Sequence, residues 1–252
     1  MKHATCLVLS LTLLSIASLG YSQIAPTPSP TEAQTKIMSL QTILHASANL
    51  PAKRRQLLDN AAAELRRHRA SGPLHLLSVC THNSRRSQLC QAWAAAAIAY
   101  YALPEIDSHS CGTEATACNP RTVAALQRAG WHTSIDRPHA SNPRYSCNLS
   151  PSGPSVQLWS KAFGDISLPR ERIVALMCCD DADQSCPHVP GALARIALHY
   201  VDPKVSDDRA DEAATYDARS QQIASEMFYL ISQLKSPAAA RPGNDSADQD
   251  AQ

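Results

Sequence analysis

Between residues 74 and 235, short apolar runs alternate with segments of helical periodicity, and this alternation limits the fold more than any other feature. The apolar runs, each expected to form a strand, are residues 74–79, 106–111, 156–159 and 172–177. The helical patterns cover residues 87–102, 121–129 and 211–234. Strands that alternate with helices form a parallel sheet covered on both faces. The sequence therefore predicts an α/β domain over residues 74–235.

The remaining segments are assigned from local signals. Residues 131–154 are polar and are expected to be irregular, residues 191–196 to form a short helix, and residues 198–201 a short extended piece. An N-terminal helical extension is predicted over residues 36–73, where Pro51 divides the pattern into two helices. Arg54 and Arg55 are expected on a solvated face of the second helix.

The N-terminus has the features of a secretory signal peptide. Residues 1–22 combine a short basic start, an apolar run and small or turn-forming residues at the end, and residues 23–35 form a Pro-containing linker. We expect an exported, periplasmic or secreted protein without a membrane span in the mature chain; the alternative is an uncleaved anchor. Residues 236–252 are expected to be disordered. With 23 Lys+Arg against 22 Asp+Glu, the chain lacks the basic surplus of nonspecific nucleic-acid binders.

The segment from Cys80 to Ser87 joins the end of a predicted strand to the start of a helix. Such a loop directs successive backbone N–H groups at one point, and the helix N-terminus adds positive potential. Both effects favour a thiolate on Cys80. The planar guanidinium of Arg86 suits two oxygens of one anion, Ser87 is placed to hydrogen-bond the thiolate, and Asn83 to hold the loop. The pattern predicts a tetrahedral-oxyanion site with a cysteine nucleophile; the alternative is a structural cysteine with two surface arginines.

This loop resembles the active-site loop of low-molecular-weight protein tyrosine phosphatases and of the thioredoxin-coupled arsenate reductases that share their fold. Further similar motifs follow in the same order: Cys111-Gly112-Thr113-Glu114, Asn119-Pro120-Arg121 and Asp202-Pro203. The resemblance covers residues 74–235, and with the N-terminal helices it is strongest to a bacterial subgroup described as protein tyrosine phosphatases. It implies a three-layer sandwich with a central four-stranded parallel sheet, the low-molecular-weight phosphatase fold, plus N-terminal helices.

The resemblance also implies a reaction. Phosphomonoesters of the phosphotyrosine type, free or on a protein, would be hydrolysed through a cysteinyl-phosphate on Cys80, with Arg86 binding the oxyanion and Asp202 serving as acid and then base. No cofactor is implied. The remaining loop residues are the expected substrate-binding set: Thr81, His82, Asn83, Ser84, Arg85 and Ser87. The alternative for Asp202 is an ordinary Asp-Pro turn.

Three positions depart from the family pattern. His82 stands where the family usually has glycine, so its Cβ must fit the loop dihedrals and its ring is expected near the pocket mouth. Arg85 stands where relatives often have cysteine or alanine, which removes one in-loop redox partner. Cys111 stands where glycine or alanine is usual.

A second thiol cluster follows the strand at residues 172–177. The chain has nine cysteines; Cys6 lies in the predicted signal peptide, and Cys179 and Cys186 lie seven positions apart, a spacing similar to the redox pair of thioredoxin-coupled arsenate reductases. This implies the alternative function of arsenate reduction by a relay of these thiols with Cys80, which needs a thioredoxin-type reductant and a flexible segment over residues 180–185.

Several other interpretations of these thiols remain open. Cys179 and Cys186 are also compatible with a static disulfide or with buried thiols. A zinc site would use Cys178, Cys179, Cys186 and His188, although no metal is assigned. If Cys80 is locked in a disulfide after export, the domain is instead a non-catalytic thiol or oxyanion-binding module.

Overall fold

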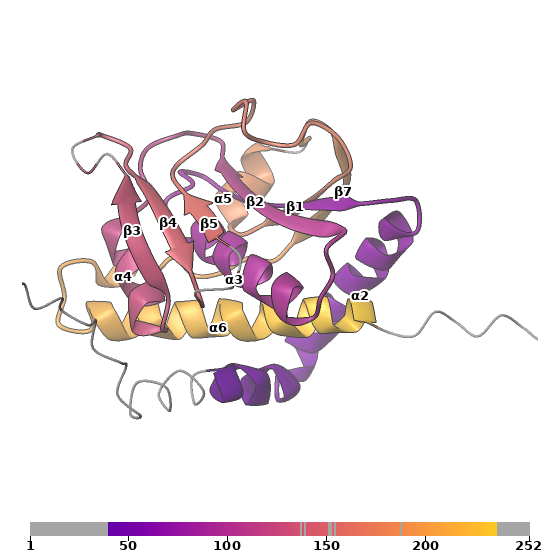
Figure 1. Cartoon of the computed structure of the whole chain (residues 1–252), viewed down its shortest axis with the longest axis horizontal. Helices are drawn as coiled ribbons and strands as arrows, with labels where there is room; N and C mark the ends of the chain where they lie inside the picture. The colour runs from indigo at the N-terminus through magenta and orange to yellow at the C-terminus, as the bar shows by residue number, and fades with distance from the viewer. Residues whose placement is uncertain are drawn as a thin grey trace, which may run out of the picture.

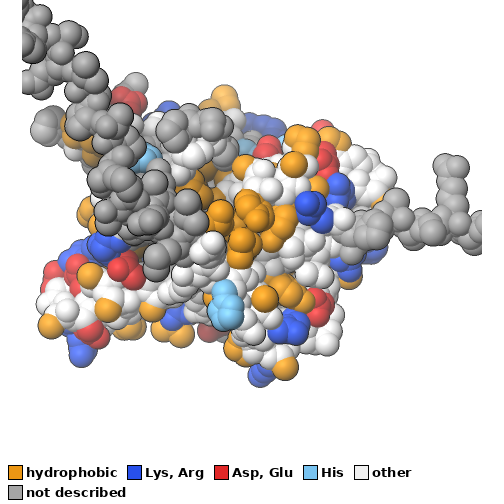
Figure 2. Space-filling view, turned by 60° about the horizontal axis from the view of Figure 1, so that its bottom comes forward, with side chains coloured by type: hydrophobic (Ala, Val, Ile, Leu, Met, Phe, Trp, Pro, Cys, Tyr) orange, Lys and Arg blue, Asp and Glu red, His pale blue; other side chains and the backbone are white. Residues whose placement is uncertain are grey.

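The computed structural model describes residues 40–136, 138, 140–150, 153, 155–186 and 188–235. The predicted signal peptide, linker and disordered tail lie outside these residues. Within the described ranges, no helix combines the length and apolar character that crossing a membrane requires. Figure 2 shows basic and acidic side chains interspersed over one face, in keeping with the balanced charge of the sequence.

A four-stranded parallel sheet forms the centre of the domain, with the strand order β2-β1-β6-β7. Its strands are β1 (Leu74–Cys80), β2 (Ile106–Gly112), β6 (Ile173–Met177) and β7 (Ala192–Ala197). All five residues of β6 are buried, because helices cover both faces of the sheet. The α/β architecture expected from the sequence is confirmed.

The helices pack as two layers around this sheet. On one side α3 (Arg86–Tyr100) lies between the sheet and the long α6 (Glu212–Ser232), and α4 (Pro120–Arg128) packs against α6 (Figure 1). The short α5 (Asp180–Ser185) packs against β1 and β6 on the side away from α6 (Figure 1). The helices α3, α4 and α6 match the predicted ones, and Asn119 caps α4 as its sequence indicates, accepting a hydrogen bond from the backbone N–H of Arg121.

The prediction of a short helix over residues 191–196 is wrong. Residues 191–196 do not form a helix, because they pair with β6 as the edge strand β7. Its side chains alternate between more and less exposed, the period-two pattern of a half-buried strand, whereas its alanine-rich composition suggested a helix.

The stretch predicted to be irregular contributes two strands. β3 (His132–Asp136) and β4 (Arg144–Asn148) join β5 (Ser155–Leu158) in a separate antiparallel sheet. β5 coincides with the predicted strand at residues 156–159 but does not enter the central sheet. The exposed, polar β3 carries no apolar pattern, so only its pairing with β4 reveals it.

The N-terminal helices are divided at Pro51, as expected. Residues 40–48 are helical, and α2 (Ala52–Arg69) begins directly after the proline and buries an apolar stripe against the domain. The prediction that Arg54 lies on a solvated face is wrong. Its guanidinium donates to both carboxylate oxygens of buried Glu226 on α6, at 2.8 and 2.7 Å.

Candidate active site

Cys80 is the last residue of β1 and lies at the base of the loop that leads into α3, with 4% of its surface exposed. Its Sγ lies 3.0 Å from the hydroxyl oxygen of Ser87 in the first turn of α3. The side-chain amide of Asn83 donates to the same hydroxyl oxygen at 2.8 Å. Because the oxygen already accepts one hydrogen bond, the Ser87 proton is free to point at the sulfur, where it would stabilise a thiolate.

Asn83 fixes the shape of the loop. Its φ of 45° lies in the left-handed region, which asparagine adopts more readily than most residues. Its side-chain oxygen accepts the backbone N–H of Lys161 at 2.8 Å, and its carbonyl accepts a hydrogen bond from Gln88 at 2.8 Å. The side-chain amide, the side-chain oxygen and the carbonyl of this buried residue therefore each hold either the loop or the serine beside the sulfur in place.

Gly112 lets the end of β2 approach the loop closely. A Cβ at this position would lie 2.5 Å from the carbonyl oxygen of Thr81 and 2.7 Å from the backbone nitrogen of Asn83. The contact is completed by the backbone N–H of Glu114, which donates to the Thr81 carbonyl at 2.9 Å. Only glycine fits, which gives the Gly-Thr sequence a steric reason.

Arg86 and Asp202, 116 residues apart in sequence, form an ion pair beside the loop. The Arg86 Nη2 donates to Asp202 at 2.7 Å, and Nη1 donates to the carbonyl of Tyr200 at 3.1 Å. The Arg86 Nε is buried and has no hydrogen-bond partner among the described residues. Asp202 also caps the short helix η1 (Pro203–Ser206) through the backbone N–H of Lys204. The fold thus brings the two predicted residues together and leaves one buried donor unused.

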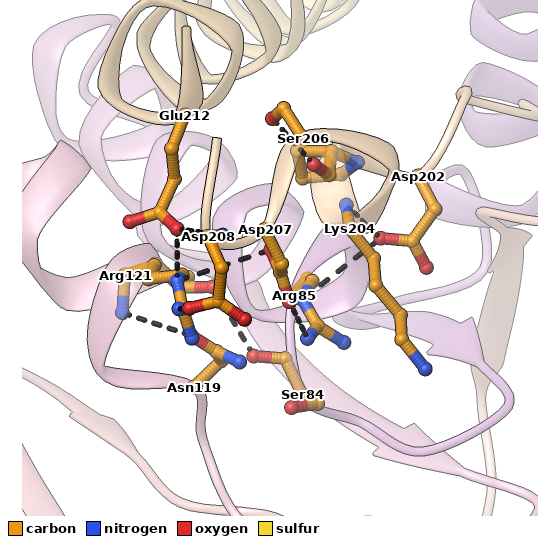
Figure 3. A network of polar contacts seen from close by, with 12 residues as sticks. Ser84, Arg85, Asn119, Arg121, Asp202, Lys204, Ser206, Asp207, Asp208 and Glu212 are labelled. Atoms are coloured by element: carbon orange, nitrogen blue, oxygen red, sulfur yellow. Dashed lines mark hydrogen bonds and ion pairs between the residues drawn. The ribbon is translucent and has the colours of Figure 1, made fainter. Parts of the chain in front are cut away.

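Arg85 ties the loop to the segment after Asp202 (Figure 3). Its guanidinium donates to Asp207 at 2.9 Å and to the Tyr216 hydroxyl at 2.7 Å, and that hydroxyl donates to Asp207 at 2.7 Å. Although burial alone would raise it, the hydrogen bond from Tyr216 and the charge of Arg85 lower the pKa of Asp207. The Arg85 side chain is therefore engaged by Asp207 and Tyr216, and its Nε also lies 4.0 Å from an Asp202 carboxylate oxygen.

The other predicted substrate-binding residues take different places. The Thr81 hydroxyl lies 3.6 Å from the Cys179 sulfur, and the carbonyl of Ser84 accepts the backbone N–H of Asn119 at 3.0 Å. His82 is exposed, its Nε2 lies 3.7 Å from a Glu114 carboxylate oxygen, and its φ is not positive. A residue with a Cβ therefore fits the position where the family usually has glycine.

Burial of the sulfur opposes the thiolate that the loop geometry favours. Burial raises the pKa of the Cys80 thiol above its ordinary value, and the hydroxyl and backbone N–H of Ser87 oppose this only in part. Burial therefore makes the thiolate form of Cys80 costly in free energy.

The second thiol cluster lies next to Cys80. The backbone N–H of Cys178 donates to Val79 at 2.7 Å, because β6 neighbours β1. The Cys178 sulfur lies 3.5 Å from that of Cys90, and the Cys179 sulfur caps α5. All eight cysteines within the described ranges carry free thiols, so the static Cys179–Cys186 disulfide is not formed. No metal-ligating group of three in the described ranges includes a thiol.

Residues 180–185 form α5 rather than a flexible segment, and this separates the two predicted redox thiols. Cys179 and Cys186 flank the helix at its two ends. At about 1.5 Å of rise per residue their backbones lie roughly 10 Å apart, whereas a disulfide needs Cα atoms within about 7 Å. A relay between these thiols therefore requires α5 to unwind.

Lys161 is a buried residue at the site that the sequence did not reveal. Its side chain is 2% exposed, lies 3.8 Å above the ring of Trp159 and donates to the Trp159 carbonyl, while its backbone supports Asn83. Burial lowers the pKa of the Lys161 amine to about 8. Nothing in the sequence around this lysine, which follows a predicted strand, indicates that its side chain is buried.

This shift predicts a pH dependence of stability. From the folded pKa of about 8 to the unfolded value of 10.5, the unfolded chain binds more protons, so the free energy of unfolding should rise with pH. The rise due to Lys161 is up to about 3 kcal/mol. Denaturant unfolding should be measured for wild type and Lys161→Met across this pH range. The difference between their free energies of unfolding should change with pH, whereas the exposed control Lys53→Met should follow wild type. Parallel pH curves for wild type and Lys161→Met would contradict the assignment.

Comparison with known proteins finds similar arsenate reductases and phosphatases. No family model matches the sequence. Two curated arsenate reductases of Staphylococcus epidermidis are 25% identical over 125 residues, which is 50% of this chain and 75% of theirs. Solved structures include a low-molecular-weight phosphotyrosine phosphatase of Vibrio cholerae O395 (16% identity, TM-score 0.44, covering 65% of this chain and 97% of that one). An arginine phosphatase of Geobacillus stearothermophilus is similar at 16% identity and a TM-score of 0.41, covering 65% and 94%.

Proposed function

We propose that this chain, which has the α/β fold of low-molecular-weight phosphatases and is similar in sequence to arsenate reductases, hydrolyses phosphomonoesters with Cys80 as its nucleophile. One observation supports this most directly: the Nε of Arg86, at the end of the loop that starts at the buried Cys80 thiol, is a buried donor without a hydrogen-bond partner in the described part of the chain. Buried donors are rarely left unpaired, so this one is suited to an oxyanion.

The reaction proceeds in two displacements. A phosphate dianion in the loop accepts the Cys80 proton, the sulfur attacks phosphorus, and the ester oxygen leaves as Asp202 protonates it. Water, deprotonated by Asp202, then attacks the cysteinyl-phosphate and releases inorganic phosphate and the free thiol. Because Arg86 is paired with Asp202, oxyanion binding to Arg86 must weaken this ion pair and free the carboxyl for its acid role.

Arsenate reduction is the second candidate, favoured by the thiols beside Cys80 and by the curated relatives. Arsenate is also a tetrahedral oxyanion, so the loop itself does not distinguish the substrates. The reductase would need a thioredoxin-type reductant and an unwound α5. Hydrolysis needs neither, which places it first.

A paired assay separates the two reactions. The purified full chain is tested on an aryl phosphate, and on arsenate with thioredoxin, its reductase and NADPH. Cys179→Ser is compared with Cys147→Ser, which alters an equally buried thiol in the separate antiparallel sheet. We expect phosphate release within about threefold of wild type in both variants and no arsenite. Arsenite production that Cys179→Ser alone abolishes would make the protein a reductase, and neither activity together with an unreactive Cys80 would make it a binding module.

A further inference from the structure

Two histidines and an aspartate meet on one face of the central sheet, away from the Cys80 loop. His75 lies on β1, and Asp107 and His109 lie on the neighbouring β2. His75 pairs in register with Asp107, and Asp107 and His109 are two residues apart, so all three side chains point to the same face. His75 precedes Cys80 by five residues, roughly 16 Å along the strand. The cluster is therefore separate from the oxyanion site.

The donor atoms of these side chains converge. The Nδ1 of His75 lies 2.7 Å, and the Nε2 of His109 lies 3.1 Å, from the same carboxylate oxygen of Asp107. One ligand atom from each residue can be chosen so that all lie within 4.8 Å of one another. Ligands of zinc at about 2.0–2.2 Å lie roughly 3–3.5 Å apart, so only small side-chain rotations are needed to surround an ion.

Hydrogen bonding within the cluster leaves one atom unsatisfied. The carboxylate accepts a hydrogen bond from His75, whereas the buried Nε2 of His109 faces the same oxygen at 3.1 Å without a well-directed hydrogen bond in the described part of the chain. A buried ring nitrogen without a well-formed hydrogen bond is costly in free energy. A metal ion would satisfy it and would also bridge the Asp107 oxygen that now faces both imidazoles.

The cluster opens onto space for additional ligands. Asp107 is half exposed, and a surface hollow of about 520 Å³ is lined by the three residues together with Ser167, Arg170 and Glu171. A three-ligand site of this kind leaves positions for water or for a small anionic or neutral ligand. Two neutral imidazoles and one carboxylate also balance part of a dication's charge.

We propose that His75, Asp107 and His109 form a binding site for a divalent transition metal of the zinc class. Two imidazoles and one carboxylate are ligands that zinc, cobalt and iron accept, whereas calcium and magnesium prefer oxygen alone. The ion would join β1 to the edge strand β2 from the solvent side and so stabilise the sheet whose other end carries Cys80.

Cobalt binding to the chelator-treated full chain tests this proposal. Co²⁺ bound by nitrogen and oxygen gives visible bands without the sulfur-to-cobalt charge-transfer band of thiolate ligation, so the spectrum separates this cluster from the cysteine thiols of the chain, eight of which are free in the described ranges. We expect a nitrogen/oxygen-type spectrum, and His75→Gln and His109→Gln should each weaken Co²⁺ binding at least about tenfold.

Two controls keep the test decisive. His45→Gln removes an exposed imidazole from the N-terminal helix and should leave Co²⁺ affinity and spectrum unchanged. Asp107→Asn changes a half-exposed side chain and should weaken Co²⁺ binding without unfolding the sheet. Weaker binding in this folded variant would therefore show that metal is not lost through misfolding. Equal Co²⁺ affinity in wild type and all three cluster variants, or a spectrum of thiolate ligation alone, would overturn the proposal.

Discussion

Cys80→Ser is expected to lower the rate of aryl-phosphate hydrolysis by on the order of 10⁴-fold or more. The serine hydroxyl is a far weaker nucleophile than the thiol. Residue 80 is also buried at the base of the loop, and this burial disfavours an anion on its side chain. Initial rates with an aryl phosphate measure the loss. Trapping of phosphorylated enzyme after a rapid acid quench should show a covalent intermediate in wild type and none on the variant.

The matched control changes the thiol next to it in the sheet. Cys111 is fully buried on β2, one strand from Cys80, and Cys111→Ala should keep the rate within a few-fold of wild type. Arg86→Lys tests the oxyanion role separately: it retains the charge but loses the planar fork, and we expect a loss of about 10²–10³-fold in kcat. Full activity in Cys80→Ser would refute the proposed nucleophile.

Arg54→Met is expected to lower the free energy of unfolding by about 3–5 kcal/mol, because it leaves the carboxylate of Glu226 buried without its partner. The Glu226 side chain is 2% exposed, and both of its oxygens accept from the Arg54 guanidinium. Although burial disfavours its charge, the hydrogen bond to Glu226 raises the pKa of Arg54, so the pair stays ionised. Denaturant unfolding monitored by circular dichroism measures the change.

Two variants separate the pair from the rest of the helix. Arg55→Met replaces the neighbouring exposed arginine and should change stability by less than about 0.5 kcal/mol. The double variant Arg54→Met/Glu226→Met removes both charges and should recover much of the lost stability. If Arg54→Met and Arg55→Met unfold alike, the buried pair does not anchor α2.

This anchor also bears on the active site. The Arg54 guanidinium lies 4.8 Å above the ring of Tyr200, and the carbonyl of Tyr200 accepts a hydrogen bond from Arg86. The N-terminal helices therefore support the segment that holds the arginine of the loop. The sequence left the role of these helices open, because a partner 172 positions away carries no local signal.

The helices and strands around the loop were predictable because their signals are local. The apolar runs of β1 and β6, the Asn-Pro start of α4 and the glycine at the end of β2 depend on periodicity, capping or steric fit within a few residues. The strands β3, β4 and β7 escaped prediction because their polar or alanine-rich residues become strands only through pairing, and the sequence did not indicate that β5 pairs with β4 in a separate sheet.

The sequence by itself determined the α/β order, the strand–loop–helix that contains Cys80, and the residue types suited to an oxyanion. Tertiary structure alone decided which distant groups meet: Arg86 with Asp202, Arg85 with Asp207, and His75 with Asp107 and His109. It also decided that burial raises the pKa of Cys80. Local patterns fix backbone conformation, whereas contacts and solvent exclusion depend on how the whole chain packs, and those two properties govern the chemistry of the site.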